Sequence, residues 1–148
     1  MHEPFFGGNE KEYVLDCINS TFVSSIGSYV SKFEEELANY CNCGEAIAVV
    51  NGTSALHAAL YAVDVKANDE VITQAFTFVA TANAIKYCGA NPIFVDVDID
   101  TMGMSASSLK IFLEMNAEIR NGKCINKNTG NKIAACIPSS LEFLPSNS

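Results

Sequence analysis

The stretch "NGTSALHAAL", residues 51–60, places small and hydroxyl-bearing residues where an apolar run passes into a helical pattern. The first N–H groups of a helix lack intrahelical acceptors, and the helix dipole adds partial positive charge beside them. Thr53 and Ser54 contribute two hydroxyl groups, and Gly52 lets another group approach the backbone closely. The junction therefore predicts an anion site, and phosphate is the anion most often bound in this way.

The standard motifs for such a junction do not fit it. The phosphate loop of nucleotide triphosphatases needs a lysine after its last glycine, and the dinucleotide fingerprint needs three glycines. The nucleophile elbow needs Gly-x-Ser-x-Gly. Two interpretations remain. Backbone N–H groups and the hydroxyls of Thr53 and Ser54 form a phosphate cup, or the same residues merely cap a helix.

A second chemical signal is the pair of aromatic residues in "QAFTFVATANAI", residues 74–85. Phe76 and Phe78 follow an apolar run, at the carboxyl edge where open α/β sheets bind ligands. One of these rings could cover a flat heteroaromatic cofactor whose phosphate lies at residues 52–54. A planar, phosphorylated cofactor suggests pyridoxal phosphate. In the alternative interpretation both phenylalanines belong to the hydrophobic core.

These residues need an alternation of strands and helices to position them. Short apolar runs predict strands at 46–50, 70–73, 92–97 and 133–137. Helical patterns of crossover length lie between the first three runs, at 54–63 and 79–88, and Gly89 is placed to end the second helix. The pattern predicts an α/β fold with a mostly parallel sheet and right-handed crossover helices.

Further helices are predicted on either side of this alternation, at 10–20, from about 30 to 40, and at 105–119. The polar stretch 120–132 reads as a surface excursion with a hairpin at 128–131. We expect three parts: N-terminal helices with a substrate-side loop at 1–45, an α/β domain at 46–138, and an aberrant or truncated tail at 139–148.

The composition excludes several classes of function. The chain has 148 residues, 49% hydrophobic and 18% charged, with a formal net charge of −8. This composition favours a globular protein and leaves no basic surface for nucleic acid. No apolar run is long enough for a membrane span and no secretory leader is evident, so a cytoplasmic location is expected. The six cysteines lack metal-site spacing, and we expect small buried hydrophobes in a reducing compartment.

Three motifs, "NGTSALHAAL", "FTFVATANAI" and "GANPIFVDVD", occur here in an order and spacing that resemble the N-terminal part of the DegT/DnrJ family. These are pyridoxal-phosphate-dependent nucleotide-sugar aminotransferases. The resemblance implies part of the large domain of the type I pyridoxal-phosphate fold. Within the family, the chain is most similar to the branch that makes 4-amino sugars for legionaminic-acid-type or bacillosamine-type glycans.

The resemblance also implies roles for individual residues. Thr53 and Ser54, with Gly52, match the phosphate-binding positions, and Phe78 matches the residue that stacks on the pyridine ring. Asn83 matches a position that supports this pocket, and Ser24 and Ser25 fall where the family's N-terminal loop approaches the sugar nucleotide. His57 lies on a helix rich in alanine and leucine, where a packed side chain is expected.

The implied reaction transfers an amino group, from glutamate, to C4 of a 4-keto-6-deoxy nucleotide sugar, in a homodimer. It needs a lysine that forms a Schiff base with the cofactor, and an acidic partner for the pyridine nitrogen. None of the eight lysines stands in that context, and Lys86, the nearest, is expected to be exposed. We therefore expect a truncated or frameshifted chain, inactive alone. The alternatives are another type I pyridoxal-phosphate enzyme and a non-catalytic remnant or interaction module.

Overall fold

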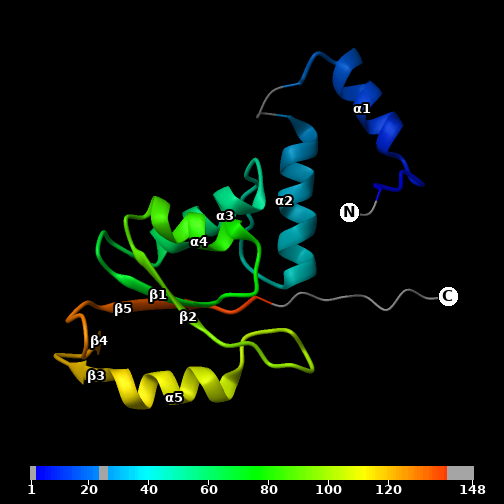
Figure 1. Ribbon diagram of the computed structural model, residues 1–148. Coiled ribbons are helices and arrows are strands. Elements are labelled where there is room, and N and C mark those ends of the chain that lie inside the picture. The colour runs from blue at the N-terminus through cyan, green and yellow to red at the C-terminus, as the bar shows by residue number, and fades with distance from the viewer. Residues whose placement is uncertain (1–2, 24–26, 140–148) are drawn as a thin grey trace. The chain divides into compact units, whose positions relative to one another are not determined.

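The computed structural model describes residues 3–23 and 27–139. The chain divides into two units, Met1–Ala48 and Val49–Ser148. Figure 1 shows the helices and strands of both units. None of the helices in these ranges combines the length and the apolar character needed to cross a membrane.

The first unit holds two helices, α1 (Glu10–Asn19) and α2 (Ser28–Cys41), close to the predicted ranges. The Tyr29 hydroxyl of α2 donates to the carboxylate of Asp16 in α1 at 3.0 Å. Helix α2 ends at Cys41, and the C-cap residue Asn42 adopts a left-handed conformation with φ of 51°. The Cys43 N–H then donates to the Ala38 carbonyl at 3.0 Å, which closes the helix end in the usual way.

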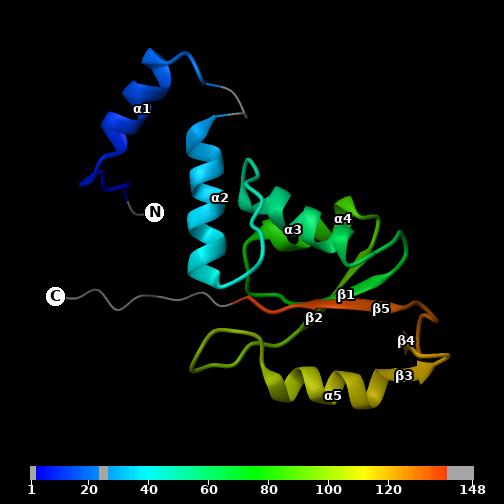
Figure 2. The same ribbon diagram turned by 180° about the vertical axis from the view of Figure 1, so that it is seen from behind.

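The second unit is built on a parallel sheet. In chain order its elements are α3 (Gly52–Ala62), β1 (Glu70–Gln74), α4 (Val79–Tyr87), β2 (Asn91–Val95), α5 (Ala106–Asn116), β3 (Ala117–Arg120), β4 (Lys123–Asn126) and β5 (Ile133–Ile137). The sheet has the order β2-β1-β5, and both pairings are parallel. Helices α3 and α4 cover one face of this sheet and α5 lies on the other (Figures 1 and 2). The predicted α/β class is confirmed.

The core of the second unit lies between the sheet and the helices α3 and α4. Its buried members are Leu60, Val65, Val71, Ala84, Ile85 and Ala90. Gly89 follows the C-terminus of α4 and has a left-handed φ of 72°. A Cβ at this position would lie 3.0 Å from the Cβ of Ala67. Glycine is therefore favoured here for two reasons: its positive φ and the lack of room for a Cβ. This agrees with the prediction that Gly89 ends the helix.

The predicted strand at 46–50 is wrong, since these residues lie outside every described strand. The side chains of Ile47 and Val50 are 80% and 87% exposed. Apolar, β-branched residues form a strand only where a neighbour supplies backbone donors and acceptors. No described strand pairs with this segment, so its residues cannot form the hydrogen bonds of a sheet despite their preference for strands.

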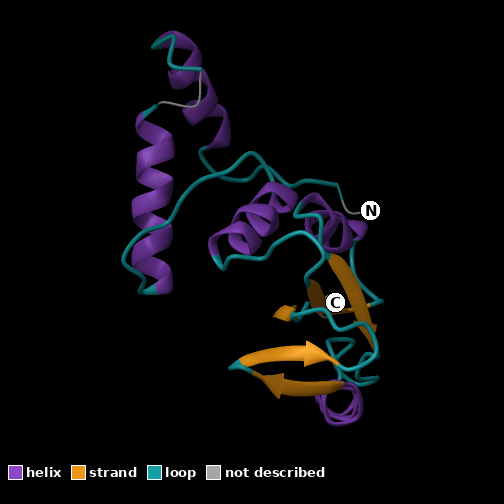
Figure 3. Cartoon of the chain, turned by 90° about the vertical axis from the view of Figure 1, so that its left-hand side faces the viewer, coloured by secondary structure: helices purple, strands orange, loops and turns teal. Residues whose placement is uncertain are grey.

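The helix expected at 105–119 ends earlier, at Asn116, and residues 117–120 form β3 instead. β3 pairs with β4 in an antiparallel hairpin beside α5 (Figure 3). Asn121 and Gly122 both have positive φ, 52° and 74°, as two-residue hairpin turns of type I′ require. The predicted hairpin at 128–131 is a turn between β4 and β5, flanked by one antiparallel bridge from Ile125 to Lys132.

The cysteines also differ from expectation. All six are free, but none is fully buried: three are exposed and three are half-buried. Cys88 comes nearest to the predicted role, because it packs against the core and loss of solvent raises the pKa of its thiol. No cluster of three or more metal-ligating side chains occurs in the described residues.

Candidate functional site

The predicted cofactor residues lie at the carboxyl edge of the parallel sheet in the second unit. β1 ends at Gln74, and α4 starts at Val79 after a short loop, so its N-terminus faces this edge. A short connection also joins the C-terminus of α3 to the start of β1, which directs the N-terminus of α3 to the same edge. α3 and α4 pack side by side (Figure 1).

The N-terminus of α3 is capped by Asn51, whose side-chain oxygen accepts the Ser54 N–H at 2.8 Å. The Ala55 N–H donates to the Asn51 carbonyl at 3.1 Å. The N–H groups of Gly52 and Thr53 have no acceptor among the described residues. A Cβ built at Gly52 would meet no atom within 4 Å, so the space beside the Gly52 Cα is open.

The N-cap role of Asn51 was not predicted from the sequence, although asparagine is a preferred N-cap residue. Its side chain takes the Ser54 N–H that the predicted phosphate cup would use. The cup is thereby reduced to two backbone donors, from Gly52 and Thr53, and two half-buried hydroxyl side chains, Thr53 and Ser54. This set still suits a phosphate, because each donor points from the positive end of a helix.

The interpretation of both phenylalanines as core residues is wrong. Phe76 is 44% exposed and Phe78 is 75% exposed. Phe78 occupies the N-cap position of α4 in an extended conformation, and its carbonyl accepts the Thr81 N–H at 3.1 Å. An aromatic ring this exposed loses little packing if it turns toward a ligand, and a flat heteroaromatic ring would cover apolar surface that now faces solvent.

The structure places the remaining predicted residues as follows. Asn83 is half-buried on α4, and its side chain has no hydrogen-bond partner within the described ranges. Ser24 and Ser25 lie outside the described residues. His57 packs edge-on against Tyr87, with ring centroids 5.8 Å apart, as expected of a structural histidine. Lys86 is exposed, and its Nζ donates to the Asn91 side chain at 3.0 Å.

A hydrogen-bond network that was not predicted from the sequence lies at the same edge. Gln74 is fully buried, and its amide N–H group donates to the carbonyls of Phe76 at 3.2 Å and Met102 at 3.4 Å. Its side-chain oxygen accepts the Ser139 N–H at 3.0 Å. The one signal in the sequence is a polar residue at the end of a buried strand, where an apolar residue would be ordinary.

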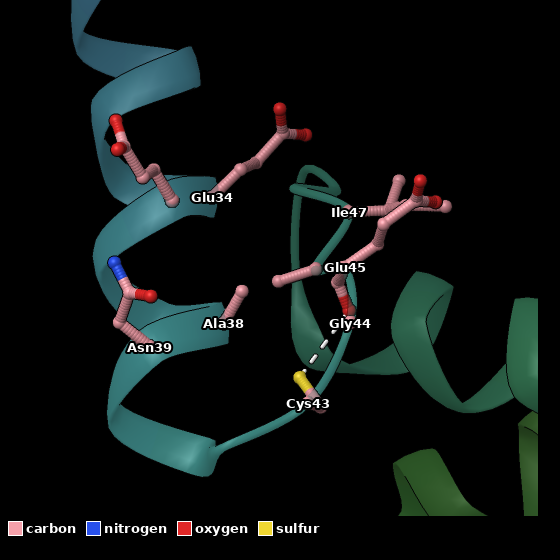
Figure 4. Close-up of a pocket in the computed structure, with 9 residues that line it drawn as sticks. Glu34, Ala38, Asn39, Cys43, Gly44, Glu45 and Ile47 are labelled. Atoms are coloured by element: carbon pink, nitrogen blue, oxygen red, sulfur yellow. Dashed lines mark hydrogen bonds between the residues drawn. The ribbon is translucent and has the colours of Figure 1, made fainter.

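A separate hollow of about 470 Å³ lies in the first unit (Figure 4). Its lining includes three carboxylates, from Glu34, Glu35 and Glu45. One Glu34 oxygen accepts the Ala48 N–H at 2.8 Å. Figure 4 shows the Glu34 and Asn39 side chains on α2, with the segment of Cys43 to Ile47 beside them. Carboxylates repel phosphate, so this hollow is not a place for a phosphorylated cofactor.

Residues 5–118 match the DegT/DnrJ/EryC1/StrS aminotransferase family. The match covers well over half of the chain, and the chain belongs to this family. The family depends on pyridoxal phosphate as its cofactor. Its fold agrees with the parallel sheet and crossover helices described above, so the predicted type I class is confirmed as a partial domain.

Two kinds of relative support this assignment. GDP-perosamine synthase from Caulobacter vibrioides is 44% identical over 110 residues, which are 74% of this chain and 30% of that protein. The solved aminotransferase from Psychrobacter cryohalolentis superimposes with a TM-score of 0.69 at 36% identity, over 75% of this chain and 28% of its own. The chain thus spans about 30% of the length of the curated relatives it matches.

A third relative bears on the cofactor. The structure of NtdA from Bacillus subtilis with bound cofactor PMP superimposes with a TM-score of 0.65 at 30% identity, over 72% of this chain and 25% of that one. The residues at the carboxyl edge of this chain suit such a group. The N–H groups of Gly52 and Thr53 and two hydroxyls are donors suited to its phosphate, and the exposed Phe78 ring has the size and shape to cover its pyridine ring.

Proposed function

We propose that this chain forms the cofactor-binding part of a pyridoxal-phosphate-dependent sugar-nucleotide aminotransferase. The observation that carries the proposal is the placement on one sheet edge of two backbone donors at the start of α3, which have no acceptor in the part of the chain that the structure describes, and of an exposed Phe78 ring. Neither feature contributes to the core, so both are available to a ligand. The family to which residues 5–118 belong supplies the chemical class.

In this proposal each part of the cofactor has a partner on the chain. The N–H groups of Gly52 and Thr53 and the hydroxyls of Thr53 and Ser54 hold the phosphate. Phe78 covers the pyridine ring and excludes water from one side of it, while Asn83 supports the pocket from α4. When bound, pyridoxal phosphate supplies the electron sink that allows an amino group to be exchanged between donor and sugar.

For the substrate we propose a 4-keto-6-deoxy nucleotide sugar, which receives an amino group at C4 from glutamate. The support is the motif likeness to the 4-amino-sugar branch and the similarity to a protein named GDP-perosamine synthase. Ser24 and Ser25 are proposed to approach this substrate. We further propose a homodimer, in keeping with the family resemblance.

We also propose that these 148 residues bind the cofactor without catalysing transfer. The reaction requires a lysine amine at the reacting carbon. Lys86, the lysine nearest to the cofactor motifs in the sequence, is exposed and hydrogen-bonded to Asn91. The pure chain, mixed with glutamate, cofactor and a 4-keto nucleotide sugar, is expected to form no amino sugar by mass spectrometry. Formation of that product would contradict the proposal.

The binding step is tested by thermal unfolding with pyridoxal phosphate and, as the matched control, pyridoxal without phosphate. A ligand that binds only the native chain raises the midpoint of unfolding. We expect a rise with the phosphorylated compound, a smaller one with pyridoxal, and loss of the difference in a Thr53→Val, Ser54→Ala double variant. Equal midpoints for both compounds with the unchanged chain would contradict a phosphate site at α3.

A further inference from the structure

Gln74 is the last residue of β1, and its side chain joins three separate segments of the chain. Its amide N–H group donates to the Phe76 carbonyl at 3.2 Å and to the Met102 carbonyl at 3.4 Å. Its oxygen accepts the N–H of Ser139, just beyond the end of β5, at 3.0 Å. The side chain is fully buried, so these partners replace all of its contacts with water.

Neither packing nor strand preference accounts for a glutamine here. A buried amide costs free energy unless its donors and its acceptor are satisfied, and glutamine is not favoured in strands. An apolar side chain of the same length would fill the same space without that cost. What only an amide provides is donation to two carbonyls together with acceptance of an N–H.

The position of the Phe78 side chain depends on the backbone of its loop, because the ring itself makes few packing contacts. The ring is 75% exposed, and its residue caps α4 without a side-chain hydrogen bond. Its location is therefore set by the backbone of residues 76–78. That backbone is held from one end by Gln74 through the Phe76 carbonyl.

A second contact holds the same loop. The Thr77 hydroxyl lies 3.1 Å from the Thr81 hydroxyl and donates to the Ser139 hydroxyl at 3.3 Å. Since Gln74 accepts the Ser139 N–H, it also fixes the partner of Thr77. Gln74 thus acts on the loop both directly, through Phe76, and through Ser139.

We propose that Gln74 is a positioning residue of the cofactor site, which holds the loop 76–78 so that the Phe78 ring is presented at one place on the sheet edge. This inference rests on the proposed function, because the ring matters only if it covers a ligand. The residue itself is buried, and its hydrogen bonds go to Phe76, Met102 and Ser139 rather than to the phosphate donors or to Phe78.

The test places a fluorophore on the loop. The chain contains no tryptophan, so Phe78→Trp introduces a single indole at an exposed position. In this background Gln74→Met removes every hydrogen bond of the amide with little change of volume. The control is Thr129→Val, which removes one partly buried hydrogen bond, from the Thr129 hydroxyl to Glu70, at the opposite end of the sheet.

We expect Gln74→Met to increase the amplitude of fast anisotropy decay of the indole about two-fold, since the loop gains freedom on the nanosecond timescale. Thr129→Val is expected to leave the decay unchanged at equal fraction folded. The same decay in both variants would overturn the proposal. If Gln74→Met does not fold, Gln74→Glu carries the test, because it keeps the acceptor for Ser139 and loses both donors.

Addition of pyridoxal phosphate separates this proposal from the one it rests on. Quenching of the indole in the Phe78→Trp chain with Gln74 intact reports a cofactor at the ring. No quenching, with an anisotropy difference between the Gln74 and Thr129 variants, would refute the cofactor site and leave Gln74 as the residue that holds the loop. Quenching without that difference would refute only the role of Gln74.

Discussion

The two ends of the parallel sheet in the second unit use buried polar side chains for opposite purposes. At the amino end Glu70 is 4% exposed, and its carboxylate accepts from Asn126 at 2.8 Å, Thr129 at 2.7 Å and Asn131 at 3.4 Å. These partners fold the polar turn 126–131 over the strand ends. At the carboxyl end Gln74 binds the backbone of the loops and leaves donors and an aromatic ring open to solvent.

The amino end of the sheet is therefore covered by the polar turn that binds Glu70, whereas the carboxyl end leaves groups exposed that a ligand could contact. Substitutions at the amino end should therefore change the free energy of unfolding, and substitutions at the carboxyl end should change ligand binding. Four substitutions test this contrast.

Replacement of Glu70 should have the largest effect. Glu70→Leu leaves three donors without their acceptor, and the amide of Asn126 among them is buried, so we expect the free energy of unfolding to fall by about 3 kcal/mol in urea titration. The matched control is Glu118→Gln, on β3, which weakens only a partly exposed ion pair with Arg120, so a change within about 0.5 kcal/mol is expected. Equal effects of the two variants would show that the amino end is not closed by Glu70.

Gly89→Ala should come next. The left-handed φ of 72° and the 3.0 Å approach to Ala67 together should lower the free energy of unfolding by about 2 kcal/mol. Gly122→Ala has a similar φ, 74°, but its Cβ would meet nothing within 4 Å, so we expect about half that loss. Thermal unfolding of both variants separates the cost of the contact with Ala67 from the cost of the positive φ. Equal losses in the two variants would show that Ala67 moves aside at no cost.

Asn51→Ala should have a moderate effect on stability and a different one on binding. Loss of the cap should cost about 1 kcal/mol, but it frees the Ser54 N–H for a phosphate. The affinity for pyridoxal phosphate, measured by equilibrium dialysis, is expected to hold or rise. Ser105→Ala removes the corresponding cap of α5 and should lower stability without any change of affinity. Weaker binding by Asn51→Ala alone would mean that its side chain itself contacts the phosphate.

Phe78→Ala should change stability least, within about 0.5 kcal/mol, because the ring is exposed. It should nevertheless weaken pyridoxal phosphate binding about ten-fold, as the loss of a stacked aromatic contact of some 1.4 kcal/mol implies. Ile119→Ala is the control, at 74% exposure against 75% for Phe78, and should alter neither quantity. A large loss of stability in Phe78→Ala would place the ring in a structural role.

Much of the second unit could be predicted because its signals are local. The parallel strands at 70–74, 91–95 and 133–137 and the helices between them follow from hydrophobic pattern and from Gly89. The hairpin at 117–126 was missed because its first strand continues the helical pattern of α5, and only its pairing with β4 reveals it. The strand predicted at 46–50 failed for the converse reason, since local preference found no partner.

The sequence by itself determined the α/β class, the family and the residue types that a phosphorylated cofactor needs, because these depend on pattern and motif along the chain. Only the tertiary structure decided which of those groups are free. Asn51 occupies the Ser54 N–H, the two phenylalanines face solvent, and Gln74 binds segments more than sixty residues apart. Hydrogen-bond partners and exposure arise from contacts between distant segments, and a one-dimensional pattern does not contain them.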